Sequence, residues 1–503
     1  MLRPRGVPPR SLAEVAGRLG VALPEGADGS AVVTGVTHDS RAVQPGDLYA
    51  ALPGSRAHGA EFAEAVRAAG AVAALTDAAG EQRLRAAGLP AYVVASPRAV
   101  LGELAAWLYG EPARRLTLVG VTGTNGKTTS TYLLEAGLRA AGRSTGLIGT
   151  IETRIGDEVV PSARTTPEST DLQALFAVMA ERGVDAVAME VSSHALAMGR
   201  VDGTTYDVAV FTNLTEDHLD FHADLDDYFA AKARLFTPER ARVGVVNVDD
   251  PYGERLAAQA TVPVVTVSPS GRADADWRVA KVELAGDGST FRLDGPGGVA
   301  VDGGTRLPGA FNVENAALSV VALAQAGLDP AVAAAGVASC PGVPGRMERV
   351  AAGQDFLAVV DYAHSPDALE RLLATARELA RGRVIAVVGC GGDRDPHKRP
   401  VMGEIVARAA DVAILTNDNP RSEDPLAILA AMKDGAVRAE PRGRVEVVPD
   451  RRAAIEKAVG LAESGDVVVV AGKGHEQGQE VAGVVHPFDD RAVLREAVAA
   501  VVR

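Results

Sequence analysis

The sequence has few cysteines and no long hydrophobic run. Its two cysteines, Cys340 and Cys390, lie far apart and form no Cys-x-x-Cys pattern. This usage is typical of a reducing compartment and argues against a structural zinc site. No uninterrupted apolar run approaches the ~20 residues that a membrane helix requires. The basic N-terminus is not followed by an apolar core, so we expect no signal peptide. We therefore predict a cytoplasmic protein with no membrane insertion.

The chain also lacks an excess of positive charge. It has 51 lysines and arginines against 65 aspartates and glutamates, which gives a formal net charge of −14. An acidic chain is a poor binder of nucleic acids and membrane surfaces, so any phosphate site must be local. With 503 residues, 47% of them hydrophobic, the composition is that of a globular protein of about three domains at roughly 150 residues each.

A glycine-rich segment at residues 123–126 separates an apolar, β-branched run from a helical pattern. Backbone N–H groups of such a loop and the positive end of the following helix favour phosphate, and Lys127 would reach the outer phosphates. The hydroxyl of Thr128 or Thr129 would suit a magnesium ion. The standard P-loop spacing requires glycine where Val121 stands, so the loop is a variant. We predict an ATP site here; an ordinary glycine turn is the alternative.

The first region reads as a small α/β domain. A capping box at Ser11 predicts a short helix that ends at Gly20. Strands are expected near residues 32–36, 48–51 and 71–75, with a helix over 60–69.

From the glycine loop onward, strands and helices alternate, which favours a mostly parallel sheet with helices on both faces. Ligands bind such sheets beyond the carboxyl ends of the strands. Glu190 stands at one such end, and a carboxylate facing a phosphate loop suits magnesium. His218 and His222 follow the next strand and would share a helical face, as zinc ligands do. The catalytic Glu of His-Glu-x-x-His is missing, so we expect His222 to be a structural histidine.

Two further segments follow in this second region. Residues 272–301 are β-like and glycine-rich, which predicts a hairpin insertion. Asn312 and Asn315 then stand at the start of a helix. Asparagine there is commonly a cap, but two of them three apart could also bind an adenine edge.

Three expected strands of the third region end beside charged residues: Arg394, Arg421 and Glu476. Two guanidinium groups and a carboxylate suit a zwitterionic amino acid, because arginine pairs bidentately with carboxylate. A solvated salt-bridge cluster is the alternative.

Taken in order, these motifs resemble the Mur ligase family over nearly the whole chain. The markers are Asp39-Ser-Arg, Gly123-Thr-Asn-Gly-Lys-Thr-Thr129, Thr165-Thr-Pro, Glu190-Val-Ser-Ser-His194, the 213–222 stretch, Gly345-Arg-Met-Glu348, Asp361-Tyr-Ala-His364, 389–394, Asp418-Asn-Pro-Arg421 and Gly472-Lys-Gly-His-Glu476. The resemblance implies an α/β protein of three domains. They are an N-terminal UDP-sugar-binding domain (1–112), a central ATP-binding domain with a P-loop-type parallel sheet (113–345) and a C-terminal Rossmann-like domain for the amino acid (346–503).

The resemblance also implies an activity. It is ATP-dependent addition of an amino acid to the D-glutamate of UDP-N-acetylmuramoyl-L-alanyl-D-glutamate, through an acyl phosphate, in peptidoglycan precursor synthesis. We expect 2,6-diaminopimelate rather than lysine, because Asp418-Asn-Pro-Arg421 is the sequence of the diaminopimelate-adding members. Its arginine would bind the distal carboxylate. The rival interpretations are a folylpolyglutamate synthetase and a nucleotide switch.

Site residues follow from the same resemblance. Expected at ATP are Gly123, Thr124, Asn125, Gly126, Lys127, Thr128, Thr129, Asn312, Asn315, Arg346 and Asp361. Expected at the UDP-muramoyl dipeptide are Ser40, Thr165, Thr166, Ser192 and Arg200. Expected at diaminopimelate are Arg394, Asp418, Asn419, Pro420, Arg421, Gly472 and Glu476. Expected at Mg²⁺ are Thr128, Glu190, His218 and a carbamoylated Lys232. The residues expected to be catalytic are Lys127, Glu190, His218 and the carbamoylated Lys232. Met198 departs from the glutamine of some members and cannot donate the same hydrogen bond.

Overall fold

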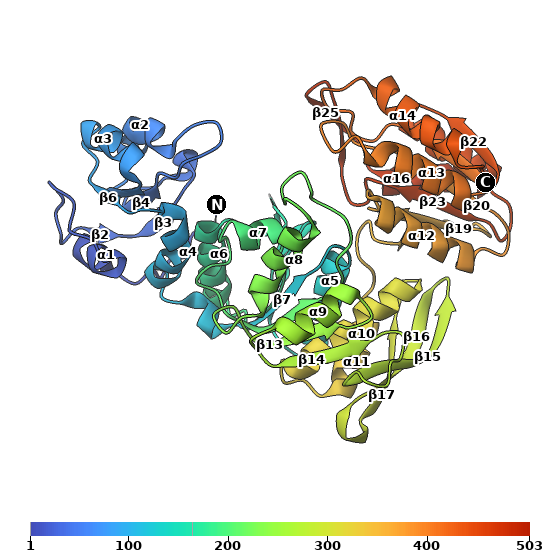
Figure 1. The fold of residues 1–503 in the computed structure, drawn as a ribbon, viewed down its shortest axis with the longest axis horizontal. Coiled ribbons are helices and arrows are strands. Elements are labelled where there is room, and N and C mark those ends of the chain that lie inside the picture. Colours follow the sequence, from blue (N-terminus) through green and yellow to red (C-terminus); the bar gives the residue numbers. More distant parts are fainter. Residues whose placement is uncertain (1, 163, 503) are drawn as a thin grey trace.

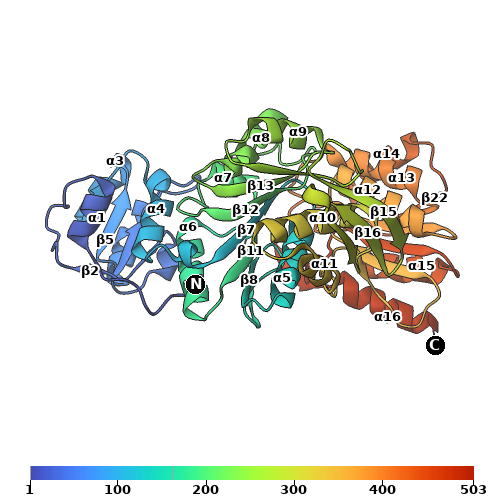
Figure 2. The same cartoon turned by 90° about the horizontal axis from the view of Figure 1, so that it is seen from below.

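The structure, a computed structural model, describes residues 2–162 and 164–502 (Figure 1). Three α/β units follow one another along the chain. The two outer units lie at opposite ends of the central one in both views (Figures 1 and 2). Three layered units with parallel sheets confirm the predicted fold class. The boundaries at 112/113 and 345/346 stay predictions.

The first unit is a parallel sheet in the order β3-β4-β5-β6, with helices on both faces. Its strands are β3 (Gly35–Thr37), β4 (Asp47–Ala50), β5 (Ala73–Thr76) and β6 (Ala91–Val93), with a ribbon of β1 (Arg10–Ser11) and β2 (Val32–Val33). Its helices are α1 (Leu12–Leu19), α2 (Ala63–Ala68), α3 (Ala78–Ala86) and α4 (Pro97–Leu108). The predicted capping box is present, since Ser11 and Glu14 cap each other's backbone N–H, and Gly20 ends the helix at φ 69°.

The central unit is built on a long mixed sheet in the order β10-β9-β8-β11-β7-β12-β13-β14-β15-β16-β17. Its parallel strands are β7 (Thr117–Thr122), β8 (Thr145–Ile148), β11 (Ala186–Glu190), β12 (Tyr206–Phe211), β13 (Ala241–Asn247) and β14 (Val264–Ser268). The edges are β9 (Glu152–Ile155), β10 (Glu158–Pro161), β15 (Trp277–Ala285), β16 (Gly288–Asp294) and β17 (Ala300–Thr305). The predicted hairpin is therefore confirmed, and β17 extends it as part of the same sheet.

Helices cover both faces of this sheet because successive β7 side chains point to opposite sides. Val119 and Val121 enter one core with α5 and α10, whereas Leu118 enters the other core with α6. The helices are α5 (Lys127–Ala140), α6 (Ser169–Glu181), α7 (Ser193–Ala197), α8 (Leu225–Ala233), α9 (Pro251–Gln259), α10 (Ala310–Gln325) and α11 (Pro330–Ala338). Ala174 and Ala177 of α6 also belong to the core of the first unit, which joins the two units.

The third unit has the sheet order β18-β19-β23-β20-β21-β22, parallel except for β18. Its strands are β18 (Glu348–Arg349), β19 (Leu357–Asp361), β20 (Val384–Val388), β21 (Val412–Leu415), β22 (Arg444–Val447) and β23 (Val467–Ala471), with a hairpin of β24 (Gly478–Val481) and β25 (Val484–Pro487). The helices α12 (Pro366–Leu379), α13 (Lys398–Ala409) and α14 (Pro425–Arg438) cover one face. The other face carries α15 (Arg451–Leu461) and α16 (Asp490–Val502).

Candidate active site

The glycine loop joins β7 to α5 and lies where the central unit meets the third unit. Gly126 has φ 88° and caps α5, a conformation that favours glycine. A Cβ on Gly126 would lie 2.3 Å from the Asn315 side-chain oxygen, and one on Gly123 would lie 1.9 Å from the Thr212 hydroxyl. Both glycines are therefore required by close packing around the loop. The N-terminus of a helix that follows such a loop favours phosphate.

Lys127, the first residue of α5, folds back over this loop. Its ammonium group donates hydrogen bonds to the carbonyl oxygens of Gly123 and Thr124, both at 2.8 Å. Burial lowers the pKa of Lys127, and the nearby Glu190 carboxylate opposes that shift. The side chain thus holds a cation at the loop, and a stronger acceptor such as a phosphate oxygen could draw it off the carbonyls.

Glu190 ends β11 with its side chain 1% exposed. One of its oxygens accepts hydrogen bonds from the Thr128 hydroxyl at 3.0 Å and the Thr150 hydroxyl at 3.1 Å, and the other accepts the Thr150 N–H at 2.7 Å. The Thr150 and Thr165 hydroxyls lie 2.9 Å apart. Carboxylate and hydroxyl oxygens therefore converge beside the loop, and these are the ligands that magnesium prefers.

The two histidines differ from their predicted arrangement. His218 lies in a turn with φ 58°, and the next helix begins only at Leu225. The shared helical face is therefore wrong, because the polar 213–224 segment forms turns between β12 and α8. His222 is 3% exposed and bonds Ser193 at 3.0 Å and Asp227 at 3.2 Å. It is a structural histidine, as predicted, whereas His218 faces the cavity described below.

Lys232 lies on α8 with its side chain 1% exposed. Its ammonium nitrogen donates to the Gly123 carbonyl at 2.7 Å and lies 4.4 Å from the centre of the Tyr228 ring. Within residues 2–162 and 164–502, no carboxylate lies within 4.0 Å of this nitrogen. Burial lowers its pKa well below the usual value, and the nearby Lys127 cation adds to the shift. The environment therefore favours an uncharged amine at this position.

A cavity of about 630 Å³ joins these groups. Its lining includes most residues predicted for ATP, the metal and the muramoyl dipeptide, namely 124–129, Thr165, Thr166, Glu190, Ser192, Arg200, His218, Lys232, Asn315, Arg346 and Asp361. It also includes Arg394 of the third unit. Gly123, the first residue of the loop, is not among the lining residues, and neither is Ser40, which lies in the first unit at the start of a short 3₁₀ helix.

Side chains predicted for the muramoyl dipeptide are ordered by the central unit itself. Thr166 donates to the Glu190 carbonyl at 2.8 Å and accepts the Ser192 N–H at 3.1 Å. Arg200 pairs with Glu168 at 2.8 Å. Its other guanidinium end lies 3.3 Å from the Met198 sulfur, at the position that departs from some family members. This part of the cavity is therefore held in place before any ligand arrives.

The two asparagines of α10 are not helix caps, because Gly309 takes that position. The Asn312 amide donates to the Pro308 carbonyl at 2.8 Å, and Asn315 bonds Asn312 at 3.4 Å and the Ser130 hydroxyl at 3.4 Å. Of the two, Asn315 lines the cavity and Asn312 does not. Glu314 also lines it. Sequence reasoning missed this residue, which stands between the two asparagines.

Arg346 and Asp361 come from the start of the third unit. The Arg346 guanidinium lies 3.3 Å from the Thr128 hydroxyl and 4.4 Å from the centre of the Tyr362 ring. The Asp361 oxygens accept the N–H groups of Met347 at 2.7 Å and Ala363 at 2.8 Å. Arg346 therefore reaches the start of α5 from the third unit, while Asp361 shapes the backbone around it.

The predicted amino-acid crevice lies at the ends of three neighbouring strands, β23, β20 and β21. Arg421 and Arg394 both flank Gly391, since a Cβ there would lie 2.9 Å and 4.0 Å from their side chains. Arg421 has φ 52°, donates to the Gly392 carbonyl at 2.6 Å and pairs with Glu480 at 3.5 Å.

Sequence reasoning missed Lys473 in this crevice. Its side chain is 0% exposed, and its ammonium group donates to Asn419 at 2.9 Å and to Glu476 at 3.0 Å. The signal was a lysine between two glycines directly after an apolar strand. The buried Lys473 ammonium group is therefore the counter-ion of the Glu476 carboxylate.

Models of the family match most of the chain. The model described as Mur ligase middle domain matches residues 121–323, Mur ligase, glutamate ligase domain matches 345–474, and Mur ligase family, catalytic domain matches 32–109. This chain belongs to the Mur ligase family. The enzyme class and fold expected from the motifs are thereby confirmed.

Relatives of this Mur ligase cover nearly its whole length. A UDP-N-acetylmuramoyl-L-alanyl-D-glutamate–2,6-diaminopimelate ligase of Streptomyces coelicolor is 62% identical over 99% of this chain and 98% of its own. One of the same name from Corynebacterium glutamicum is 50% identical over 95% and 94%. A solved structure of a ligase with that name is 34% identical, with a TM-score of 0.70 over 99% of this chain and 100% of that chain. Folylpolyglutamate synthase of Mycobacterium tuberculosis, complexed with ADP and AMPPCP, is 22% identical with a TM-score of 0.59 over 75% of this chain and 92% of that chain, and shares the fold.

Proposed function

We propose that this Mur ligase joins 2,6-diaminopimelate to the D-glutamate carboxyl group of UDP-N-acetylmuramoyl-L-alanyl-D-glutamate, with ATP as co-substrate. The observation that carries the proposal is the name shared by relatives that are 62% and 50% identical over at least 95% of this chain. The charged crevice of the third unit supports it independently. The folylpolyglutamate alternative has only a shared fold in its favour.

The reaction needs ATP because a carboxylate has no usable leaving group. Transfer of the γ-phosphoryl group to the glutamate carboxylate forms an acyl phosphate and ADP. The amine of diaminopimelate then attacks the acyl carbon, the C–O bond to phosphate breaks, and one proton leaves the nitrogen as the amide forms. Exclusion of water from the reacting groups would favour the second step, since water would hydrolyse the acyl phosphate.

Lys127 and Arg346 are the cations that we assign to the phosphates. Lys127 would exchange the Gly123 and Thr124 carbonyls for phosphate oxygens, which are stronger acceptors. Arg346 approaches from the third unit beside Thr128. Together with the N-terminus of α5 they would stabilise the charge that spreads over the phosphoryl group during transfer.

We further propose that Mg²⁺ is held by Thr128, Glu190, His218 and a modified Lys232. The buried oxygens of Thr128 and Glu190 are a hard-ligand set, which fits this ion. Among the described residues there is no cluster of three His, Cys, Asp or Glu side chains that could hold a metal, and magnesium is commonly bound by one or two carboxylates plus substrate phosphates. The ion would neutralise phosphate charge during transfer.

Carbamoylation of Lys232 would complete that set. An uncharged amine adds carbon dioxide and releases one proton, which converts the side chain into an anionic carbamate with two oxygens. The lowered pKa of Lys232 supplies the uncharged amine that this reaction needs.

We assign Arg421 and Arg394 to the distal carboxylate of diaminopimelate and Glu476 to its distal ammonium. Asp418, Asn419, Pro420 and Gly472 would shape the pocket. Lysine has no distal carboxylate, so it leaves the two guanidinium groups without a substrate partner. One relative has a name that states no amino acid: UDP-N-acetylmuramyl-tripeptide synthetase of Leifsonia xyli, 47% identical over 99% of this chain and 98% of its own. The choice of diaminopimelate over lysine therefore depends also on these side chains.

Domain roles complete the proposal. Residues 1–112 would hold the UDP group through Ser40, residues 113–345 would bind ATP, and residues 346–503 would bind diaminopimelate. We place the reaction in the cytoplasm, where ATP is available and where Cys340 and Cys390 stay free thiols. No helix among the described residues is both long and apolar enough to cross a membrane.

The experiment is an amino-acid panel with the UDP-muramoyl dipeptide and ATP, scored by phosphate release and product mass. Only diaminopimelate should give a product of matching mass, and phosphate release should need both substrates. Equal product from L-lysine would refute the assigned substrate, and phosphate release without either substrate would favour a nucleotide switch.

A further inference from the structure

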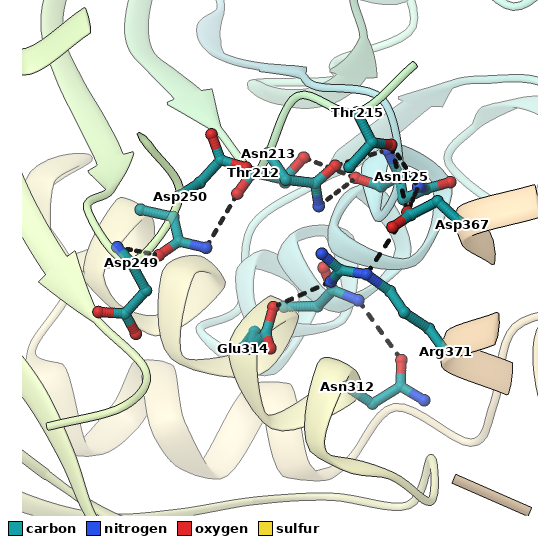
Figure 3. Close-up of polar contacts among 12 residues, drawn as sticks. Asn125, Thr212, Asn213, Thr215, Asp249, Asp250, Asn312, Glu314, Asp367 and Arg371 are labelled. Atoms are coloured by element: carbon teal, nitrogen blue, oxygen red, sulfur yellow. Dashed lines mark hydrogen bonds and ion pairs between the residues drawn. The ribbon is translucent and has the colours of Figure 1, made fainter. Parts of the chain in front are cut away.

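Asp367, in the first turn of α12, connects the third unit to the phosphate loop. Its carboxylate accepts a hydrogen bond from the Asn125 amide at 2.8 Å and another from the Thr215 hydroxyl at 3.2 Å. Figure 3 shows Asp367 and Arg371 pointing from α12 toward these two residues and toward Glu314. We call the contacts of Asp367 with Asn125 and Thr215 the interdomain bridge.

The other polar contacts of Asn125 come from the central unit. Its backbone N–H donates to the Asn213 side chain at 2.9 Å, and its carbonyl accepts from the Thr212 hydroxyl at 2.6 Å. The backbone at the tip of the loop is therefore fixed within one unit. The side-chain amide of the same residue donates both to Thr215 of that unit, at 3.5 Å, and to Asp367 of the third unit. Movement of the third unit away from the loop would break the hydrogen bond between Asn125 and Asp367. It would leave the backbone contacts of Asn125 with Asn213 and Thr212 intact.

Arg371 balances the charge that the bridge brings to the loop. It lies one helical turn beyond Asp367 and contacts its carboxylate at 3.4 Å and that of Glu314 at 3.8 Å. Burial raises the pKa of Glu314, and the Arg371 cation opposes that shift. The nearby carboxylates of Asp249 and Asp250 raise the pKa of Glu314 further. Because Arg371 balances its charge, the Asp367 carboxylate can hold Asn125 without strongly repelling a bound polyphosphate.

We propose that Asp367 is a positioning residue that couples ATP binding to docking of the third unit. The proposal rests on the proposed function, because it takes the loop to be the ATP site. The bridge favours the loop conformation that holds the phosphates only while α12 lies against the loop. By linkage, ATP binding must then favour docking of the third unit to the same extent.

The test measures the dissociation constant of β,γ-methylene-ATP with Mg²⁺ for the full chain and for four variants: Asn125→Ala, Asp367→Ala, the double variant and Asp367→Asn. Loss of a partly exposed, charge-assisted hydrogen bond should weaken binding about fivefold to twentyfold in either single variant. The double variant should bind no more weakly than Asp367→Ala, because that single variant already removes both contacts of the bridge. Asp367→Asn keeps an acceptor oxygen and should regain part of the affinity.

Glu370→Ala is the matched control. Glu370 lies on the same helix, carries the same charge and is exposed. The affinity of the Glu370→Ala variant for the ATP analogue should therefore stay within twofold of wild type. A fluorescence pair across α12 and α5 supplies a second readout. The analogue should shorten the pair distance in wild type and Glu370→Ala, and should do so less in Asp367→Ala.

The outcomes separate the two proposals. Multiplicative losses in the double variant, or an Asp367→Ala affinity equal to that of Glu370→Ala, would overturn the bridge while the ATP site stands. A wild-type chain that bound no nucleotide would overturn the proposed function and the bridge with it. Should Asp367→Ala fail to fold, Asp367→Asn and Asn125→Ala carry the test, and wild-type affinity in both would overturn the bridge.

Discussion

Lys473→Met would remove the buried cation beneath the proposed diaminopimelate pocket. The ammonium group donates to Asn419 and Glu476 and lies 3.9 Å from Asp418. Methionine has a similar shape but cannot donate, so Glu476 would lose the ammonium group and keep its hydrogen bond from the Asn419 amide at 2.9 Å. We expect the carboxylate to turn toward solvent and the pocket to lose its order.

The size of the effect depends on the exposure of the two partners. Breaking a fully buried pair costs about 3–5 kcal/mol. The Glu476 side chain is 29% exposed, so water would solvate part of the stranded charge. The value for a hydrogen bond to a charged group, about 1.5–3 kcal/mol, is therefore the better guide, and it corresponds to roughly ten- to hundredfold in kcat/KM. Stability should change less, because methionine also removes the desolvation cost of a buried ammonium.

The assay is steady-state kinetics with each substrate varied in turn. Lys473→Met should raise KM for diaminopimelate and leave KM for ATP within about twofold, since neither Lys473 nor Glu476 is among the residues that line the cavity at the glycine loop. Lys457→Met is the matched control, because Lys457 pairs with Glu446 on the surface of the same unit, where ion pairs contribute only about 0–1 kcal/mol. An unchanged KM for diaminopimelate in Lys473→Met would refute the reasoning, and equal increases for both substrates would point to a general structural role instead.

Three further predictions concern the chemistry and the choice of amino acid. Lys127→Ala should lose about 10²–10³-fold in kcat with little change in the thermal transition, because the lost cation acts on the transferring phosphoryl group; near-normal turnover at saturating ATP would contradict this. Lys232→Ala should be nearly inactive and should regain activity with short carboxylic acids, whereas an unimpaired variant would exclude the carbamate. Arg421→Ala should lower kcat/KM for diaminopimelate about ten- to hundredfold, and intact use of diaminopimelate would show that the pocket is elsewhere. This figure is smaller than that for a fully stranded charge, because Arg394 also flanks Gly391 and would still face the distal carboxylate.

Most of the fold could be predicted because local signals and global structure agree. The Ser11 capping box, the glycine loop before α5 and the apolar runs of β20 and β23 each act over a few residues, and the structure has all of them. His218 and His222 show the limit of a spacing argument. Their four-residue separation fits a helix, but the polar segment between β12 and α8 forms turns, and the next helix begins only at Leu225.

The residues that the sequence could not assign make contacts across long distances in the chain. Asp367 meets Asn125 across 242 positions, and Lys473 meets Asn419 across 54. No periodicity encodes such pairs, because they depend on how separate sheets are placed. Asn312 illustrates a related limit of sequence reasoning, and its role at ATP stays a prediction. It shares a helical start with Asn315, yet the helix turns it toward the Pro308 carbonyl and away from the cavity.

One geometric rule still unites the parts of the site that were predicted. The glycine loop follows β7, Glu190 ends β11, and Asp418 and Gly472 follow β21 and β23. Parallel strands send all their carboxyl ends to one edge of a sheet, so the loops there meet whatever their distance in sequence. Two sheets that face each other with these edges form a cavity lined from both sides, as the presence of Lys127 and Arg394 in one cavity shows. A phosphoryl donor bound at one edge and an amine held at the other would then approach the same carboxylate. For a ligase of this kind, placement of the third unit thus matters as much as any single side chain.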